Sequence, residues 1–155
     1  MNVRTTLIVA SVIAFVFLFS AEVASAADKN GNMVEDDQYV VHYSAFNSTM
    51  LTPEIAKAYN IMRSRQRAIM NIAVQKKMPD GKTKAVMSQL EGYTGALGGS
   101  ERPLEFTMVT EGDAIYYLAE FLVGNGEKLN FEINVKPTPE RAPLKVQFTQ
   151  AFYPD

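Results

Sequence analysis

The chain has 155 residues, of which 47% are hydrophobic and 21% are charged, and its formal net charge is -2. This composition fits one globular domain and excludes a disordered chain. The nearly balanced charge excludes bulk electrostatic binding of nucleic acid. Cysteine is absent, so disulfides, thiolate nucleophiles, iron–sulfur clusters and lipidated cysteines are excluded as well.

The first 26 residues are predicted to be a cleaved secretory signal. Arg4 gives a positive start, Leu7–Ala21 is an apolar run, and Ala24-Ser25-Ala26 is the small-x-small pattern that signal peptidase accepts. The run would span roughly 22 Å as a helix, whereas a bilayer core needs about 30 Å, so a retained anchor is disfavoured. Cleavage is expected after Ala26, with Ala27 as the alternative. A soluble, Sec-exported periplasmic protein is the resulting expectation.

Residues 27–37 are expected to be a loose leader, followed by a single domain over residues 38–155. In that domain the hydrophobic period is two, which indicates strands. The predicted strands are residues 39–46, 68–74, 85–90, 104–108, 115–123, 129–135 and 144–148. Turn signals separate them, including Pro79-Asp80-Gly81 and Gly124-Asn125-Gly126. The pattern predicts an all-β, antiparallel β-sandwich of immunoglobulin-like architecture with about seven strands.

One short helix is expected near residues 53–59. Thr52 is a suitable N-cap, Pro53 fits the first helical position, and Glu54 favours the positive end of the helix dipole. Asn60 tolerates the left-handed conformation that ends a helix. Two turns are too short to be stable alone, so this helix must dock on the sheets.

Two segments have a composition suited to binding. Arg63, Arg65 and Arg67 alternate, so on a strand they would project from one side about 6–7 Å apart and could hold an anionic ligand. A solvated face is the other interpretation, because the arginines have the opposite parity to the apolar residues that follow. Gly92–Ser100 contains four glycines and is expected to be a flexible loop, with Tyr93 and Leu97 at its tip as contact residues.

Two alternative functions remain open. His42 is the one side chain expected to titrate near neutral pH, so a hydrolase that pairs His42 with a nearby carboxylate such as Glu54 is one alternative. The other is a periplasmic copper-binding β-sandwich, because thioethers bind copper(I). The methionines are scattered, however, and the filling of core gaps accounts for them. No catalytic residue, metal site or cofactor is therefore assigned.

The stretch from Tyr39 to Arg65 is the most distinctive part of the chain. It contains His42-Tyr43-Ser44-Ala45-Phe46-Asn47-Ser48, then Leu51-Thr52-Pro53-Glu54-Ile55-Ala56, then Tyr59 to Arg63-Ser64. These units resemble the exported bacterial domain of unknown function family 4426, and the likeness runs through the mature chain to the region of Gln150-Ala151-Phe152-Tyr153. The resemblance implies an exported single-domain β-sandwich with no known catalytic residues. Asn47 belongs to the shared motif, and its ability to hydrogen-bond local backbone favours a structural role over ligand binding.

The favoured function is a non-enzymatic binding or accessory module of the cell envelope. Binding would use an uncovered sheet edge, which accepts an extended peptide, or the surface around Asn47, Arg63 and the Gly92–Ser100 loop. Arg65, Tyr93 and Leu97 complete the set of candidate binding residues. The expected partner is an envelope protein or peptide, with no nucleic acid and no stable membrane insertion after cleavage of the signal.

Overall fold

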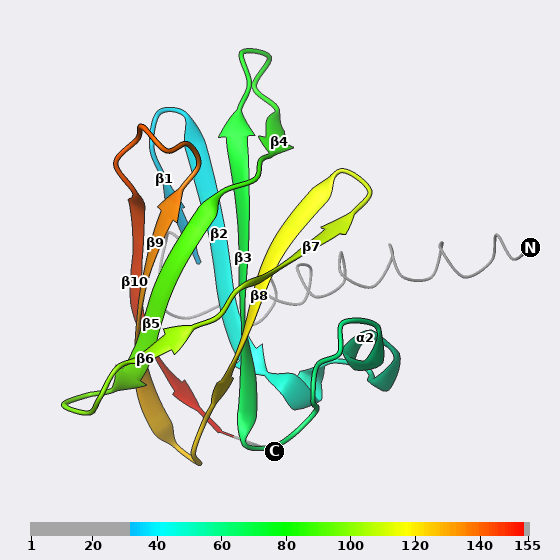
Figure 1. The fold of residues 1–155 in the computed structure, drawn as a ribbon, viewed down its shortest axis with the longest axis vertical. Coiled ribbons are helices and arrows are strands. Elements are labelled where there is room, and N and C mark those ends of the chain that lie inside the picture. The colour runs from blue at the N-terminus through cyan, green and yellow to red at the C-terminus, as the bar shows by residue number, and fades with distance from the viewer. Residues whose placement is uncertain (1–31, 154–155) are drawn as a thin grey trace, which may run out of the picture. The chain divides into compact units, whose positions relative to one another are not determined.

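Two antiparallel β-sheets packed face to face make up the computed structural model of the protein, which describes residues 32–153 (Figure 1). Sheet 1 has the order β1 (Met33–Glu35), β2 (Tyr39–Asn47), β3 (Arg67–Lys77), β8 (Ala114–Leu122) and β7 (Thr107–Glu111), with β4 (Thr83–Ala85) paired to the end of β3. Sheet 2 has the order β10 (Leu144–Phe152), β9 (Glu127–Lys136), β5 (Gln89–Ala96) and β6 (Arg102–Leu104). The predicted antiparallel sandwich is confirmed. The predicted cleavage site at Ala26 lies outside the described residues.

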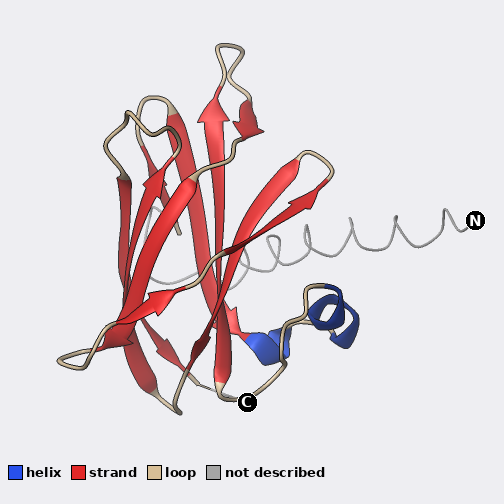
Figure 2. Cartoon of the chain, viewed as in Figure 1, coloured by secondary structure: helices blue, strands red, loops and turns tan. Residues whose placement is uncertain are grey.

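Among residues 32–153, helical structure is confined to one end of the sandwich, where η1 (Ser48–Met50) and α2 (Pro53–Ala58) link β2 to β3 (Figure 2). The predicted helix start is confirmed, because the Thr52 hydroxyl accepts a hydrogen bond from the Ile55 N–H at 3.4 Å. Asn60 has the expected positive φ of 55°. Ile55 and Ala56 are buried, so the short helix is stabilised by docking.

The core lies between the two sheets and follows the period-two pattern. On β9 the alternate residues Leu129, Phe131, Ile133 and Val135 are buried. They pack with alternate residues of β3, of which Met70, Ile72 and Val74 are fully buried. Rings reinforce the lower part of this layer, where Phe121 and Phe131 meet edge-to-face at 5.2 Å between centroids. This apolar layer is the main stabilising contact between the sheets.

The predicted strand 104–108 is wrong, because the chain changes sheets within it. β6 ends at Leu104 in sheet 2, and β7 begins at Thr107 in sheet 1. Phe106, in the crossing segment, packs against the core. Gly92 makes room for that ring, since a Cβ on Gly92 would lie 3.2 Å from it and 3.0 Å from Ile133 Cγ1. Apolar alternation looks the same within one strand and across a crossover between two sheets.

The glycine-rich segment Gly92–Ser100 was expected to be a loop, but it is strand β5 as far as Ala96. Gly95 is required where the following turn folds back, because a Cβ there would lie 2.8 Å from the Ser100 carbonyl oxygen. The predicted strand 85–90 is also divided, between the end of β4 and the start of β5. Residues 33–35, expected in the loose leader, form β1 and pair with residues 40–42 of β2.

Arg141, in the connection between β9 and β10, bridges the two sheets. Its guanidinium pairs with Asp36 in the turn before β2, and it lies 5.0 Å from the centre of the Tyr39 ring. Burial alone would raise the pKa of the Asp36 carboxyl. Hydrogen bonds from the Gln38 and Tyr39 N–H groups, both 2.8 Å, together with Arg141, outweigh burial and hold that pKa below its ordinary value of 3.8.

The substitution Ile133→Ala is expected to reduce the free energy of unfolding by about 2–5 kcal/mol, because it removes a fully buried side chain and leaves a cavity. Urea unfolding followed by far-ultraviolet circular dichroism measures the change. Leu97→Ala is the control, because Leu97 is 69% exposed and its truncation is expected to cost less than about 0.5 kcal/mol. Equal losses in the two variants would contradict the assigned core.

Asp36→Asn is expected to lower the free energy of unfolding at pH 7 by about 1–2 kcal/mol, a value reduced for partial exposure. Since the folded pKa of Asp36 is depressed, its contribution is complete above the unfolded pKa and is lost as the pH falls through the folded pKa. The gap between the variant and the original protein should therefore close below about pH 4. Asp37→Asn is the control, since that side chain is 81% exposed. A gap independent of pH would refute the charge-based explanation.

Candidate functional site

The segment between β2 and β3 is anchored by two serines. The Ser48 hydroxyl, which is fully buried, donates to the Ser64 carbonyl at 3.1 Å and accepts from the Ser64 N–H at 2.9 Å. The Ile61 N–H closes the helical end by donating to the Ala56 carbonyl at 2.7 Å. Because both ends of the segment are tied together, the residues that follow Ser64 have a fixed position beside the start of β3.

The three alternating arginines do not share one face, because only Arg67 belongs to a strand. Arg63 lies in the preceding loop and donates from Nη2 to the Thr49 carbonyl at 3.1 Å. Arg67 forms an ion pair with Glu120 on the neighbouring β8, at 3.3 Å. Arg65 lines a cleft at the end of the sandwich. The expectation of one arginine face fails because the strand begins later than the sequence pattern suggested.

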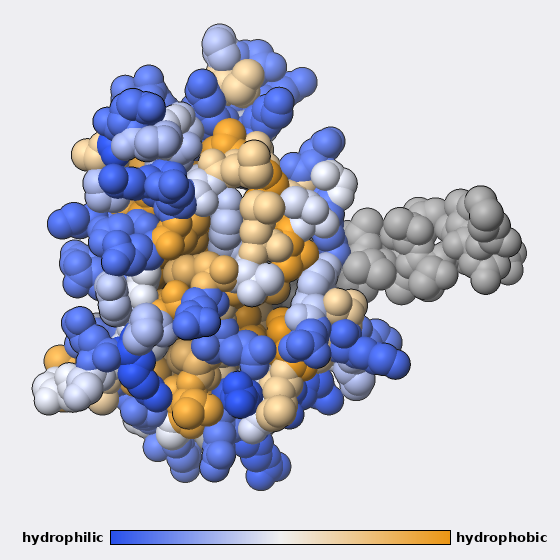
Figure 3. All heavy atoms as spheres, in the orientation of Figure 1, coloured by the Kyte–Doolittle hydropathy of each residue, from blue (hydrophilic) through white to orange (hydrophobic). Residues whose placement is uncertain are grey.

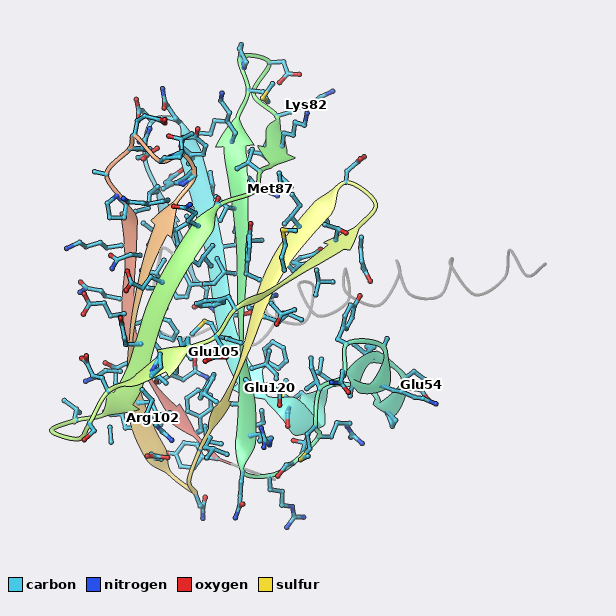
Figure 4. All side chains as sticks on the ribbon, viewed as in Figure 1. Glu54, Lys82, Met87, Arg102, Glu105 and Glu120 are labelled. Carbon is cyan, nitrogen blue, oxygen red and sulfur yellow. The ribbon has the colours of Figure 1, made fainter. Side chains whose placement is uncertain are left out.

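This cleft, here called the arginine cleft, has a volume of about 510 Å³ and is lined by both sheets. Sheet 1 contributes the chain before β3 and the end of β8, and sheet 2 contributes β6 and the start of β9. The lining residues are Arg65, Gln66, Arg102, Leu122, Val123, Gly124, Asn125 and Glu127. The Val123 N–H donates to the Gln66 carbonyl at 2.9 Å, which joins the two segments of sheet 1 at this end. Arg102 lies at this lower end, where β6 begins (Figure 4).

Two guanidinium groups in the arginine cleft are open to a ligand. Arg65 and Arg102 are exposed, and within residues 32–153 neither forms an ion pair, in contrast to Arg67 and Arg141. The Glu127 carboxylate accepts the Gly124 N–H at 2.6 Å and so stabilises the turn between β8 and β9. Leu122, 51% exposed, adds an apolar surface. Guanidinium groups bind carboxylates and phosphates through paired hydrogen bonds, so this cleft suits an anionic group next to an apolar one.

Asn47 and Arg63, both candidate binding residues in the sequence, contact the chain itself. Asn47 Nδ2 donates to the Tyr153 carbonyl at 2.8 Å and fastens the end of the chain to β2. Its Oδ1 atom is buried and has no hydrogen-bond partner in the described part of the chain. Arg63 donates to the Thr49 carbonyl in η1. Neither residue lines the arginine cleft.

Tyr93 and Leu97 lie away from the arginine cleft, on and beside the outer face of sheet 2. Tyr93 lines a second hollow of about 510 Å³, together with Asn130 and Gln147 among others. Its hydroxyl donates to Glu91 at 2.9 Å, and this hydrogen bond to a carboxylate raises the pKa of Tyr93. Leu97 projects from the turn after β5. The structure therefore divides the predicted site residues among three places.

The hydrolase alternative needs a carboxylate beside His42. His42 is half-buried in β2, opposite Met33 of β1 and Ala73 of β3. Glu54, however, points away from the strands on the outer side of α2 (Figure 4). Its pKa is lowered by hydrogen bonds to its own backbone N–H and to the Thr52 hydroxyl. Glu54 is therefore engaged at the first turn of α2, and catalysis by His42 stays a prediction.

The methionines are spread over the described part of the chain. Met70 is in the core, whereas Met50, Met62, Met78, Met87 and Met108 are exposed at separate places. Met33 is the cross-strand partner of His42, so a thioether and an imidazole lie on neighbouring strands. Residues 32–153 hold no group of three or more His, Asp or Glu side chains positioned for a metal ion. Copper binding stays a prediction.

A contact that the sequence did not indicate fixes α2. The Tyr59 hydroxyl, just after the helix, donates to Glu111 at the end of β7. Burial and then this hydrogen bond raise the pKa of Tyr59 well above its ordinary value. A third hollow, of about 400 Å³, lies beside this contact and includes Glu105 and Glu120 (Figure 4). Residues 52 positions apart meet here, a contact that no local pattern signals.

The chain belongs to the family described as domain of unknown function DUF4426, whose model matches residues 33–155. The structure of a DUF4426 family protein from Pseudomonas aeruginosa PAO1 is similar, with 32% identity, a TM-score of 0.67, and coverage of 79% of this chain and 94% of that one. FetP of uropathogenic E. coli strain F11 shares the fold, with 9% identity, a TM-score of 0.55, and coverage of 78% and 92%. No curated protein matches the sequence. Within residues 32–153, no helix has the length and apolar character needed to cross a membrane.

Proposed function

We propose that this protein is exported to the periplasm and acts there as a non-enzymatic binding module for an envelope peptide or protein segment that carries a carboxylate next to an apolar side chain. The observation that carries this proposal is the arginine cleft. It presents two exposed guanidinium groups, one from the turn before β3 and one from β6, beside an exposed leucine.

The amino-terminal sequence supports export. A positive start, a short apolar run and the Ala24-Ser25-Ala26 exit form the pattern of a secretory signal. FetP, which shares the fold, was recombinantly expressed in the periplasm of E. coli BL21(DE3). An oxidising compartment is also compatible with a chain that has no cysteine, because such compartments permit disulfides without requiring them.

The chemistry of the cleft favours binding over catalysis. Its charged groups are two guanidinium groups, which hold a carboxylate through charge-assisted hydrogen bonds, and one carboxylate already engaged by a backbone N–H. Leu122 offers an apolar contact beside them, so a ligand that matches both features gains from each. Arg65 and Arg102 come from segments that are fixed by the sandwich, which limits the entropy lost on binding.

Export predicts a shorter chain in the periplasm. Osmotic-shock fractionation followed by mass spectrometry should recover residues 27–155 in the periplasmic fraction. The double variant Ala26→Leu with Ala27→Leu blocks both expected cleavage positions and should accumulate as the full-length chain. Val12→Leu, a conservative change in the apolar run, is the control and should be processed normally. Full-length chain retained in the cytoplasm would contradict export.

Carboxylate binding is tested with a short acetylated peptide ending in leucine, made with a free carboxylate or with a terminal amide. Isothermal titration should detect the carboxylate form and find the amide at least tenfold weaker. The double variant Arg65→Gln with Arg102→Gln should weaken the carboxylate form by about tenfold or more, because two charge-assisted hydrogen bonds are lost.

Arg63→Gln is the matched control for this experiment, since Arg63 is an exposed arginine outside the cleft. It should leave the affinity within about twofold. Equal binding of the two peptides, or equal loss in the control and in the double variant, would remove the basis for the proposed site.

A further inference from the structure

The hairpin formed by β3 and β4 projects from the end of the sandwich opposite the arginine cleft (Figure 1). β4 pairs only with the last three residues of β3, at Gln75–Lys77. The turn beyond is well defined, because the Met78 N–H donates to the Lys82 carbonyl at 2.8 Å and Asp80 Oδ1 accepts the Lys82 N–H at 3.0 Å. The hairpin therefore has a defined backbone path beyond the core.

Charge on this hairpin has the opposite sign to that of the whole chain. Residues 76–87 contain four lysines and one aspartate, a formal net charge of +3, whereas the full chain has -2. Lys77 pairs with Glu35 at 2.6 Å. The other three lysines are exposed and have no ion pair within residues 32–153; they are Lys76, Lys82 and Lys84.

Lys76 and Lys84 are directly opposite each other in the register. Like charges in this position repel each other and destabilise a hairpin. An anionic surface would relieve the repulsion, so the pair favours the bound state over the free state. Lys82 extends the same charge to the tip of the hairpin (Figure 4).

Apolar side chains accompany the lysines. Met87 is 68% exposed just after β4, and Met78 is 38% exposed at the start of the turn. In Figure 3 the tip of the molecule is mostly hydrophilic, and an apolar strip runs down the middle of the viewed face below it. A soluble acidic partner needs the lysines alone. A membrane surface uses both, because lysines meet anionic headgroups while flexible apolar side chains enter the boundary with the acyl chains.

We propose that the β3–β4 hairpin docks the protein on a membrane surface that contains anionic phospholipid. Lys76, Lys82 and Lys84 bind the headgroups, and Met78 and Met87 insert beside them. The arginine cleft would then face away from the membrane, since Arg102 and Lys82 lie at opposite ends of the sandwich (Figure 4). This surface is separate from the arginine cleft, and either proposal can fail without the other.

The chain has no tryptophan, so a single introduced tryptophan reports on its own surroundings. Protein isolated from expressing cells, with its N-terminus defined by mass spectrometry, is titrated with vesicles of phosphatidylglycerol and phosphatidylcholine or of phosphatidylcholine alone. In Met87→Trp the emission should shift to shorter wavelength with the anionic vesicles only. Met62→Trp is the control, because Met62 is 60% exposed but precedes β3 at the other end of that strand, and its emission should not change.

Removal of charge tests the role of the lysines. In the Met87→Trp background, Lys76→Gln, Lys82→Gln and Lys84→Gln together should weaken binding to anionic vesicles by about 100-fold, whereas the three Lys→Arg changes should preserve it. All variants share the same N-terminal segment, so their differences report the hairpin alone. Thermal unfolding checks the fold, and the Gln variant should be at least as stable, because the Lys76–Lys84 repulsion is gone.

Three results would overturn the proposal. One is equal binding to neutral and anionic vesicles. The second is unchanged binding in the Gln variant. The third is binding of heparin, as a soluble polyanion, without any shift of the Met87→Trp emission on anionic vesicles, which would indicate an acidic macromolecule as the partner. Loss of binding as salt is raised supports the proposal, because exposed charges are screened.

Discussion

The apolar layer between β3 and β9 is the contact on which the rest of the structure depends. Met70, Ile72 and Val74 on one side, and Leu129, Ile133 and Val135 on the other, have no exposed surface. Removing such side chains from water is the main favourable contribution to folding. With no disulfide to reinforce it, this layer and the contacts around it must fix how the two sheets are placed.

The sites follow from that placement. Arg65 precedes the central strand of sheet 1, and Arg102 begins the edge strand of sheet 2, so they share a cleft only because the sheets are packed together. Bridging contacts such as the Arg141–Asp36 ion pair tie the other end in a similar way. The β3–β4 hairpin is different, because it extends past the core and is organised by its own turn. The apolar core thus positions charged side chains at the ends of the sandwich, where they remain solvated.

Local patterns in the sequence were enough to predict the class of fold. The alternation on β9 and the N-cap at Thr52 act over a few residues, and both are confirmed. The Pro79-Asp80-Gly81 turn is confirmed too, with Gly81 at a φ of 82°. Local patterns could not reveal where the chain changes sheets at Phe106, because Leu104, Phe106 and Met108 alternate in the sequence although Leu104 is buried and Met108 is exposed. Gly92 and Gly95 also led to the wrong prediction of a loop. Both positions need glycine because neighbouring atoms leave no room for a side chain.

The site was harder to predict, because its residues meet through tertiary pairing. Arg65 was identified from the arginine series, but its partner Arg102 lies in a short strand with no distinctive motif. The hydrogen bond between Tyr59 and Glu111 likewise could not be predicted, because these residues meet only in the folded structure. The sequence predicted a hydrogen bond from Asn47 to local backbone, but its amide donates instead to the carbonyl of Tyr153, 106 residues along the chain.

Native-state hydrogen exchange measures most directly whether one shared layer holds the sandwich together. The account predicts that the slowest amides of β3 and of β9 exchange with the same free energy, equal to that of global unfolding, and that destabilisation by urea shifts both equally. Exchange of one sheet at a clearly lower free energy than the other would show two separable units and contradict the account.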